Sequence, residues 1–439
     1  FLCAHERERE ERSGMEGTAE GDSRRVLEGE ERESSAVEEQ EERESAVAAE
    51  GEEEEESGVD EGTAESESTA AKGNTAAGTV RERKTATVKR ETENESEETQ
   101  EKEVWLLTGG TGLIGTRVAA FLASQMEAKP WIRLRVLVRN SSDTSRLAGE
   151  CTAAFLSRQL EVARTDLEVP HLLRKVFTPD VTYVYHVAAK GGDWGVEEEF
   201  YLSNELATAN LVRFASELPR LKRFLHVSTV DVYPHIAPAD CHEWVPPQRT
   251  SRYHYSRTKA AAEYIVTAAD LPWTIVRPAV VYGPHSYTWG LQEAMLLHRG
   301  RGVTVAGARC RSGAAYVDDV ARAIIMAAQS EVSLCRRYNV SNPESCSTWR
   351  QFYDDIADGI GAQRAKISVP YWLAWVCAWL MEFFYRLFGW DDNRPLLTFF
   401  LLRLVANDQD WPIDAARRDF GWRPEVSHEE GIKRTVEWL

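Results

Sequence analysis

The sequence predicts an α/β fold in which helices cover both faces of a parallel sheet. From Val104 onward, short apolar segments alternate with helical patterns of roughly 10–15 residues, the order that a parallel sheet requires. The first apolar segment runs directly into a glycine-rich turn at Thr108–Gly115, which a helical pattern follows. Such a strand, turn and helix form the first unit of a doubly wound sheet.

Six apolar segments are predicted strands: Val104–Leu107, Ile132–Val138, Leu160–Thr165, Val181–Ala188, Arg223–Ser228 and Trp273–Arg277. Helical patterns occupy Phe200–Ala215 and Tyr253–Ala269. Because the alternation stops after Pro284, we expect a Rossmann-type domain over residues 104–283 and a smaller substrate lobe with apolar helices over 284–439. Sheets of this class bind ligands at the carboxyl ends of their strands.

The first hundred residues differ sharply from the rest. Residues 1–103 contain 34 acidic and 14 basic residues, a net charge of −20, whereas residues 104–439 carry a net charge of +1. The segment has one aromatic residue, Phe1, and too little apolar surface to offset the entropy of ordering. We therefore expect a disordered acidic tail over 1–103. A charged helix over Glu28–Glu56 is the alternative, and the basic patch Arg81–Arg90 allows the hypothesis of a docking tail.

Composition excludes several classes of protein. The folded part lacks the basic surplus of a nucleic-acid-binding body, and no uninterrupted apolar run of about 20 residues supports a polytopic membrane protein. Seven cysteines without CxxC spacing predict neither a disulfide framework nor a zinc site. They favour a reducing compartment, so we expect the cytoplasm or the cytoplasmic face of an internal membrane such as the endoplasmic reticulum.

The glycine-rich turn predicts a dinucleotide site. Gly109, Gly112 and Gly115 permit a tight turn and close approach of a pyrophosphate, which the free N–H groups at a helix N-terminus then bind. A purely structural glycine turn is the alternative. The expected cofactor contacts in this turn are Gly109, Thr111, Gly112, Leu113, Ile114 and Gly115.

Two further strand ends bear on the choice of cofactor. Arg139 follows the second strand, where an acid would bind the ribose hydroxyls of NAD. A cation there favours the 2′-phosphate of NADP, although an exposed charge without a role is nearly as consistent. Asp166 follows the third strand and is placed to accept from the adenine amino group, or to cap a helix. The expected cofactor is NADP or NAD, with NADP favoured.

A candidate catalytic group lies in the second half of the sheet domain. Tyr255 and Lys259 are four residues apart, so a helix places both side chains on one face. An ammonium group near a phenol lowers its pKa, which suits proton exchange with a hydroxyl or carbonyl during hydride transfer. The preceding strand ends in Ser228 and Thr229, whose hydroxyls could polarise the same substrate oxygen.

These motifs together resemble those of the extended short-chain dehydrogenases/reductases. The glycine turn, His186–Ala189, Ser228-Thr229 and Tyr255-x-x-x-Lys259 follow that family's order. The later motifs Arg277-Pro278, Tyr282–Pro284, Tyr316–Val320, Tyr338–Val340 and Phe420–Pro424 extend the resemblance over residues 104–439. The chain is most similar to the 3β-hydroxysteroid dehydrogenase and sterol-4α-carboxylate dehydrogenase branch, on account of Gly192–Gly195 and the apolar stretch before the last helices.

The resemblance implies roles for particular residues. Tyr255 would be the acid/base, Lys259 would lower its pKa and hold the ribose, and Thr229 would supply the supporting hydroxyl, with Ser228 as the alternative. The residues implied to line the cofactor are His186, Ala188, Ala189 and Pro278. Asn204 is a weaker candidate for a supporting polar role, and we expect it to be a satisfied helix asparagine. Gly191 either leaves room for the cofactor or only turns the chain, and His226 is expected to be a satisfied core residue.

The sequence departs from the family pattern at two places. Arg139 replaces the acid usual in this branch, which puts preference for NAD in doubt. Sugar dehydratases carry an acidic pair after Ser-Thr, whereas this chain has Val230 and then Asp231. Without the first acid there is no proton donor to expel water, so dehydration is not expected, and Asp231 is expected to face solvent.

The C-terminal part contains an apolar stretch over 370–402. Tyr371–Met381 has no charged residue, and Trp372, Trp375 and Trp379 recur at helical spacing. Eleven uncharged residues are too few to span ~30 Å of hydrocarbon. The stretch could lie in a membrane interface, cover an apolar substrate, form a homodimer contact or belong to the core.

We therefore interpret the sequence as an NAD(P)-dependent oxidoreductase that interconverts a secondary alcohol and a ketone, with a 3β-hydroxysteroid or sterol as the leading substrate. A nucleotide-sugar epimerase and a non-catalytic NAD(P)-binding regulator are the alternatives. A small apolar substrate is the expected ligand, and neither a metal ion nor nucleic acid is expected.

Overall fold

The computed structural model describes residues 101–234, 241–345 and 347–439. These residues belong to one compact unit, Gln100–Leu439. The acidic tail expected over 1–103 lies outside the described residues, apart from its last three positions. The first strand, β1, begins at Glu103, where the Glu103 carboxylate accepts a hydrogen bond from Lys222.

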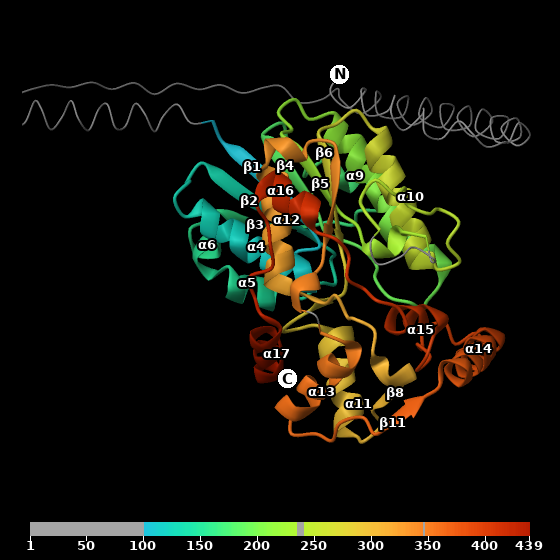
Figure 1. Cartoon of the computed structure of the whole chain (residues 1–439). Helices are drawn as coiled ribbons and strands as arrows, with labels where there is room; N and C mark the ends of the chain where they lie inside the picture. The colour runs from blue at the N-terminus through green and yellow to red at the C-terminus, as the bar shows by residue number, and fades with distance from the viewer. Residues whose placement is uncertain (1–100, 235–240, 346) are drawn as a thin grey trace, which may run out of the picture. The chain divides into compact units, whose positions relative to one another are not determined.

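A seven-stranded parallel sheet is the centre of the fold (Figure 1). Its order is β10-β6-β5-β4-β1-β2-β3. The strands are β1 (Glu103–Thr108), β2 (Ile132–Val138), β3 (Leu160–Arg164), β4 (Val181–His186), β5 (Arg223–Val227), β6 (Trp273–Pro278) and β10 (Arg336–Val340). The chain moves outward from β1 to β3 and then crosses to β4 on the other side of β1. The predicted doubly wound sheet is confirmed, and its switch point lies between β1 and β4.

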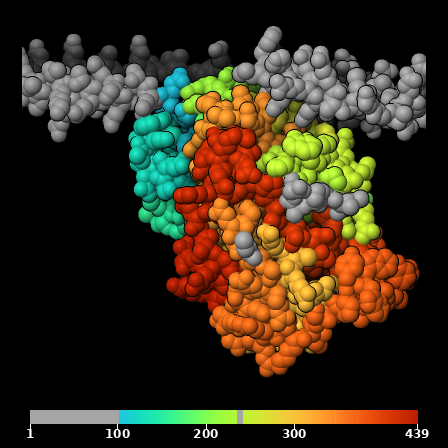
Figure 2. Space-filling view, in the orientation of Figure 1, coloured from blue at the N-terminus to red at the C-terminus, as the bar shows by residue number. Residues whose placement is uncertain are grey.

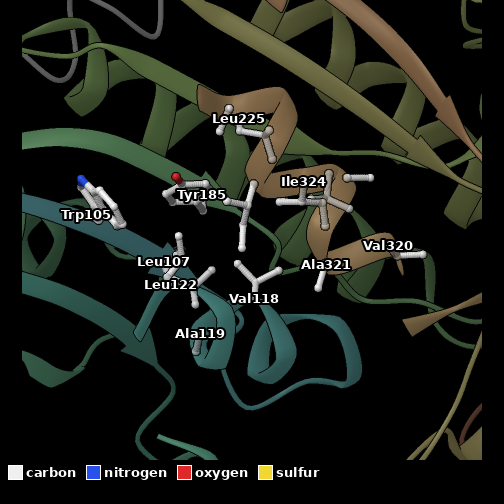
Figure 3. Close-up of a cluster of buried hydrophobic side chains, with 14 of the residues drawn as sticks. Trp105, Leu107, Val118, Ala119, Leu122, Tyr185, Leu225, Val320, Ala321 and Ile324 are labelled. Carbon is white, nitrogen blue, oxygen red and sulfur yellow. The ribbon is translucent and has the colours of Figure 1, made fainter. Parts of the chain in front are cut away.

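Helices cover both faces of this sheet. On one face, α4 (Leu113–Met126) and α12 (Val317–Gln329) pack against the strands, and Figure 3 shows Val118, Leu122 and Ile324 meeting Leu107 and Tyr185. The other face carries α9 (Ala207–Ser216) and α10 (His254–Ala268) (Figure 1). Small side chains on α12 allow this close packing, because Ala321, Ala323, Ala327 and Ala328 are all buried.

Short helices fill the connections of the sheet domain: α5 (Ser145–Glu150), α6 (Thr152–Leu156), α7 (Pro170–Leu173) and α8 (Glu197–Phe200). Between α8 and α9 the chain forms a π-helix at Tyr201–Leu206. The sequence predicts one continuous helix over Phe200–Ala215, and the structure divides it there. π-helical turns are rare and often lie beside functional sites.

The smaller lobe is built from the later part of the chain. It contains α11 (Gln292–His298), α13 (Trp349–Gly359) and the two-stranded sheet of β8 (Val303–Val305) and β11 (Ile367–Val369). A second short sheet pairs β7 (Val281–Tyr282) with β9 (Ala315–Tyr316). The helices α14 (Tyr371–Leu387), α15 (Phe399–Val405), α16 (Asp414–Phe420) and α17 (His428–Trp438) follow. Trp349 and Phe352 of α13 are fully buried in the core of the lobe.

Part of the C-terminal half returns to the large sheet. The strand β10 pairs with β6 at the sheet edge, and α12 packs on α4. The domain boundary expected at residue 284 assigns β10 and α12 to the smaller lobe, whereas both pack with the large sheet. The strand β10 contains two arginines and an asparagine, so its hydropathy gives no signal of which sheet it will join.

The described cysteines differ in whether they form a disulfide. Cys335 is disulfide-bonded, whereas Cys151, Cys310 and Cys377 are free thiols. Among the described residues, no group of three His, Cys, Asp or Glu side chains is placed to bind a metal ion.

Candidate active site

The glycine turn between β1 and α4 leaves no space for side chains. Gly109 has a φ of +74°, and a Cβ there would lie 2.7 Å from the backbone of Ala188. A Cβ on Gly115 would lie 2.0 Å from the carbonyl oxygen of Gly109. Gly112 starts α4 without a side-chain cap, so the first N–H groups of the helix stay available to an anion. This geometry fits a dinucleotide pyrophosphate.

A cavity of about 780 Å³ opens beside this turn, at the carboxyl ends of the strands. Its volume lies within the range of small-molecule and cofactor sites. The structure brings most of the predicted residues to its wall: Gly109, Thr111, Gly112, Leu113, Ile114, Gly115, Arg139, Asp166, Ala188, Ala189, Ser228, Tyr255 and Lys259. The glycine turn and the Tyr255/Lys259 pair therefore face one cavity.

Three predicted residues lie outside this wall. Pro278 ends β6 and pairs with Val340. His186 is buried below the cavity, where its two ring nitrogens are each 2.9 Å from a hydroxyl, those of Thr108 and Thr208. Burial lowers the pKa of His186 to about 3, and the charge of Lys259 contributes to this lowering. His186 is therefore a neutral support for the turn, because Thr108 also accepts from the backbone N–H of Ala188.

The third such residue, Thr229, reaches the site through Tyr255. Its hydroxyl is close enough to the Tyr255 phenol to lower the pKa of the phenol. The same hydroxyl donates to Asp231 Oδ2 at 3.1 Å and accepts from the backbone N–H of Asp231 at 3.2 Å. These two bonds to Asp231 fix the position of the Thr229 hydroxyl. Ser228, the predicted alternative, lines the cavity itself.

The electrostatic setting of Tyr255 differs from the expectation. Burial raises the pKa of Tyr255, the charge of Asp231 raises it further, and the hydrogen bond with Thr229 acts in the opposite direction. The sequence predicts that Lys259 lowers this pKa. In the structure, Lys259 instead donates to the carbonyl oxygen of Val227 at 2.7 Å, so its charge is directed toward β5.

Burial destabilises the charged form of Lys259. Its side chain is fully buried, and Nζ lies 3.3 Å from Nε2 of His226. Burial lowers the pKa of Lys259 to about 7. Burial also lowers the pKa of His226, so this ring is neutral and accepts from the ammonium. His226 is therefore a hydrogen-bond partner of Lys259 on α10. The other ring nitrogen of His226, Nδ1, has no hydrogen-bond partner among the described atoms.

Asp231 does not face solvent, contrary to the expectation from sequence. Its carboxylate lies 3.0 Å from the guanidinium of Arg403 on α15. Burial raises the pKa of Asp231, and the charge of Arg403 opposes that rise. The carboxylate is thus enclosed between the strand end that carries Thr229 and a helix of the C-terminal segment. No local sequence signal pairs these residues.

Buried polar contacts also fix the helix α10, which carries Tyr255 and Lys259. Arg277 of β6 donates to both carboxylate oxygens of Glu263 on α10, at 2.8 and 2.6 Å, and both side chains are fully buried. Asn204 is satisfied, as predicted: it bonds both backbone polar groups of Lys190 and donates to Thr258 on α10. These contacts hold α10 against β6 and the π-helix.

At the other end of the cavity, β2 and β3 present two cations. Arg139 lines the cavity and is exposed. Arg164, at the end of β3, donates to the carbonyl oxygens of Arg139, Asn140 and Ser142 at 3.3, 2.8 and 3.2 Å. Arg164 thereby shapes the loop that carries Arg139. Asp166 lines the same part of the wall.

The model of the NAD dependent epimerase/dehydratase family matches residues 105–341, more than half of the 439 residues. The chain belongs to this family. The match begins at β1 and ends just beyond β10, so it covers the whole sheet, the glycine turn and the Tyr255/Lys259 pair. The resemblance to extended short-chain dehydrogenases/reductases is confirmed at the level of this NAD-dependent family.

Relatives named for several different activities are similar to the chain at 19–28% sequence identity. The chain is 28% identical over 264 residues to a 2-alkyl-3-oxoalkanoate reductase of Stenotrophomonas maltophilia, covering 58% of this chain and 79% of the relative. It is 25% identical over 364 residues to the 3beta-hydroxysteroid-dehydrogenase/decarboxylase isoform 1 of Arabidopsis thaliana, covering 77% and 80%. A solved UDP-glucuronic acid 4-epimerase of Bacillus cereus, in complex with NAD, has a TM-score of 0.55 at 19% identity, covering 76% of this chain and 98% of that one.

Proposed function

We propose that this family member is an NAD(P)-dependent oxidoreductase that interconverts a secondary alcohol and a ketone. The observation that carries the proposal is that Tyr255 and Lys259, one helical turn apart on α10, line the same cavity as the glycine turn. A bound nicotinamide would supply or accept the hydride. The residues of this chain would bind the substrate oxygen and move its proton.

The proton step follows from the state of Tyr255. Because burial and Asp231 raise the pKa of Tyr255, the phenol is protonated at neutral pH and is the form that donates to a ketone oxygen. Thr229 donates its own proton to Asp231, so the phenol proton stays available for the substrate oxygen. This setting favours the reductive direction.

Lys259 would hold the ribose of the cofactor. An ammonium has three N–H donors, and those of Lys259 include one directed at Val227 and one at His226. One donor remains for a ribose hydroxyl on the cavity side. The turn fits the rest of the dinucleotide, since only glycine at positions 109 and 115 allows the backbone to pack this tightly and so to approach a pyrophosphate closely.

We propose NADP as the preferred dinucleotide. Arg139 lies where NAD-specific sites carry an acid, and the carbonyls next to it already accept from Arg164. A 2′-phosphate would meet the exposed Arg139 guanidinium at this end of the cavity. Arginine pairs bidentately with phosphate oxygens.

We propose a small apolar substrate, with a sterol or steroid 3β-hydroxyl or 3-ketone as the leading member. Two relatives are named for reduction of an oxoalkanoate and for dehydrogenation of a 3β-hydroxysteroid. Aromatic rings of the C-terminal segment support this class, because Phe400 of α15 packs on Tyr253, two residues before Tyr255.

A nucleotide-sugar epimerase is the second candidate, since the family model covers epimerases as well. The decisive experiment incubates the purified chain with sterols, steroids and nucleotide sugars, each with NADP(H) and NAD(H), and follows the absorbance of the reduced nicotinamide. We expect equimolar oxidation of NADPH with an apolar ketone. Conversion of a nucleotide sugar without any net change in the nicotinamide would overturn the proposal in favour of epimerisation.

A further inference from the structure

The helix α14 is apolar around most of its circumference and yet exposed. Only Ala374 and Ala378 are buried, against Leu402 of α15. Trp372 is 68% exposed and Trp379 is 48% exposed. The other exposed apolar side chains are Tyr371, Leu373, Trp375, Val376, Leu380, Phe383, Phe384 and Leu387. Figures 1 and 2 show this orange segment projecting from the side of the smaller lobe.

An exposed patch of this size is unusual for a water-facing surface, because monomeric proteins rarely leave large contiguous apolar areas uncovered. No helix in the described part of the chain has the length and apolarity needed to span a bilayer. The patch is therefore a docking surface, and the charges next to it indicate what docks there.

Cations flank the N-terminal end of α14. The strand β11 leads directly into the helix, and Val305 of β8 and Val369 of β11 pack on the same small cluster as Ala374. The segment 299–311 contains four arginines and no acidic residue. Four exposed side chains, those of Arg299, Arg301, Arg309 and Lys366, lie within four residues of these two strands along the chain. Two apolar side chains of this sheet are exposed as well: Val303 is 50% exposed and Ile367 is 62% exposed.

The acidic residues lie at the opposite end of the helix. Asp391 and Asp392 follow its C-terminus, and Glu382 is turned inward, where it accepts from the backbone N–H of Phe399 at 2.6 Å. Exposed aromatic rings extend along the whole helix, and Arg386 is exposed near its C-terminal end. The four cations near β8 and β11 lie toward its N-terminal end. We name the set of α14 side chains Trp372–Leu380 with Arg299, Arg301, Arg309 and Lys366 the aromatic-cationic face.

We propose that the aromatic-cationic face binds the surface of an anionic lipid bilayer. Indole rings favour the interfacial layer, where an apolar body and a polar N–H are both accommodated. A helix lying in that layer buries its apolar side by a few ångströms, and neighbouring cations interact with anionic headgroups. This surface is independent of the reaction assigned to the cavity.

A second copy of the chain fits this surface less well. A two-fold contact brings the same patch of both molecules together. The cations of the aromatic-cationic face would then crowd at the contact with no acidic residue in segment 299–311 to pair with them. An anionic bilayer supplies the missing negative charge.

The test is co-sedimentation of the full chain with vesicles of phosphatidylcholine, with and without phosphatidylserine. We expect binding to the vesicles that contain phosphatidylserine and a marked loss of binding at high salt, because salt screens exposed charges. The double substitution Trp372→Ser/Trp379→Ser should abolish binding to the vesicles that contain phosphatidylserine. Trp244→Ser is the matched control, since Trp244 is 80% exposed on a loop outside this face and should bind as the native chain does.

A second pair of variants separates charge from insertion. Arg301→Gln/Lys366→Gln should weaken binding to phosphatidylserine vesicles about tenfold or more, whereas Arg133→Gln/Lys433→Gln, two exposed cations elsewhere, should not. Circular dichroism and thermal unfolding confirm that each variant is folded. Absence of native binding to either vesicle would overturn the proposal, as would a dimer in sedimentation velocity that only the tryptophan variant dissociates.

Discussion

The guanidinium of Arg403 on α15 lies 3.0 Å from the carboxylate of Asp231, two residues beyond Thr229. This ion pair joins the C-terminal segment to the strand end that holds the candidate catalytic hydroxyl. Arg403 also lies over the rings of Tyr253 and Phe400. The C-terminal segment therefore completes the surroundings of Tyr255.

Removal of Arg403 should destabilise the fold through Asp231. In Arg403→Gln the buried carboxylate loses its cation, and we expect the free energy of unfolding to fall by about 1–3 kcal/mol. Adding Asp231→Asn should restore at least half of that loss. Urea unfolding of both single variants and the double variant gives the coupling. The surface ion pair Arg417–Glu344 is the control, because Arg417→Gln should cost less than about 0.5 kcal/mol. Strictly additive effects would contradict the account.

Lys259 should make stability depend on pH. The pKa of Lys259 is about 7 in the folded chain, against an ordinary value of 10.5 for a solvated lysine. Between these values the unfolded chain binds more protons, so the free energy of unfolding rises with pH in this window and gains nothing more above it. Lys259→Met lacks this contribution. From about pH 7 to pH 9 the native chain should therefore gain up to about 2–3 kcal/mol relative to the variant.

Urea unfolding at both pH values measures this difference. Lys433→Met serves as the control, because Lys433 is exposed and its replacement should leave the pH dependence unchanged. A parallel pH dependence in the native chain and Lys259→Met would show that Lys259 keeps its charge when buried.

Arg139 should set the preference between dinucleotides. Arg139→Ala should weaken binding of NADPH by roughly tenfold, the effect of losing a charged contact to phosphate, and leave NADH within about twofold. Fluorescence titration of the reduced cofactors measures both. Arg133 lies on β2, the strand that precedes Arg139, and is also exposed, so Arg133→Ala should change neither affinity. Equal losses for NADPH and NADH would assign Arg139 a general role only.

Gly115 should tolerate no side chain. In Gly115→Ala the new Cβ would lie 2.0 Å from the carbonyl oxygen of Gly109, which we expect to cost about 2 kcal/mol or more and to abolish dinucleotide binding. Gly149→Ala is the matched control: it lies in α5 with no atom within 4 Å, so it should stabilise by about 0.5–1 kcal/mol. Thermal unfolding and cofactor titration compare the two.

The sheet and the cofactor turn could be predicted because their signals are local. The strand predicted over Ile132–Val138 has the same bounds as β2, and the apolar run at Trp273–Arg277 differs from β6 by one residue. The glycines of the turn are three residues apart, and a Cβ at Gly109 or Gly115 would collide with the backbone. Spacing along the chain contains this information.

The remaining features depend on contacts between distant segments. Arg403 and Asp231 are 172 residues apart, and Lys259 meets His226 across 33 residues. No local pattern of hydropathy or charge predicts such a pair. Asp231 is enclosed by its contact with Arg403, and the pKa of Tyr255 is raised by burial and by the charge of Asp231. The sequence alone therefore led us to expect Asp231 in solvent and a lowered pKa for Tyr255.

The most direct test of the central claim is the turnover of Tyr255→Phe. With the apolar ketone and reduced cofactor that the native chain uses, kcat should fall by about 10²–10⁴-fold, because the phenol supplies the proton. The dissociation constant of the reduced cofactor should stay within about threefold, since the glycine turn binds the pyrophosphate. A kcat within a few-fold of the native value on the same substrate would contradict the assignment of Tyr255 as the acid of this site.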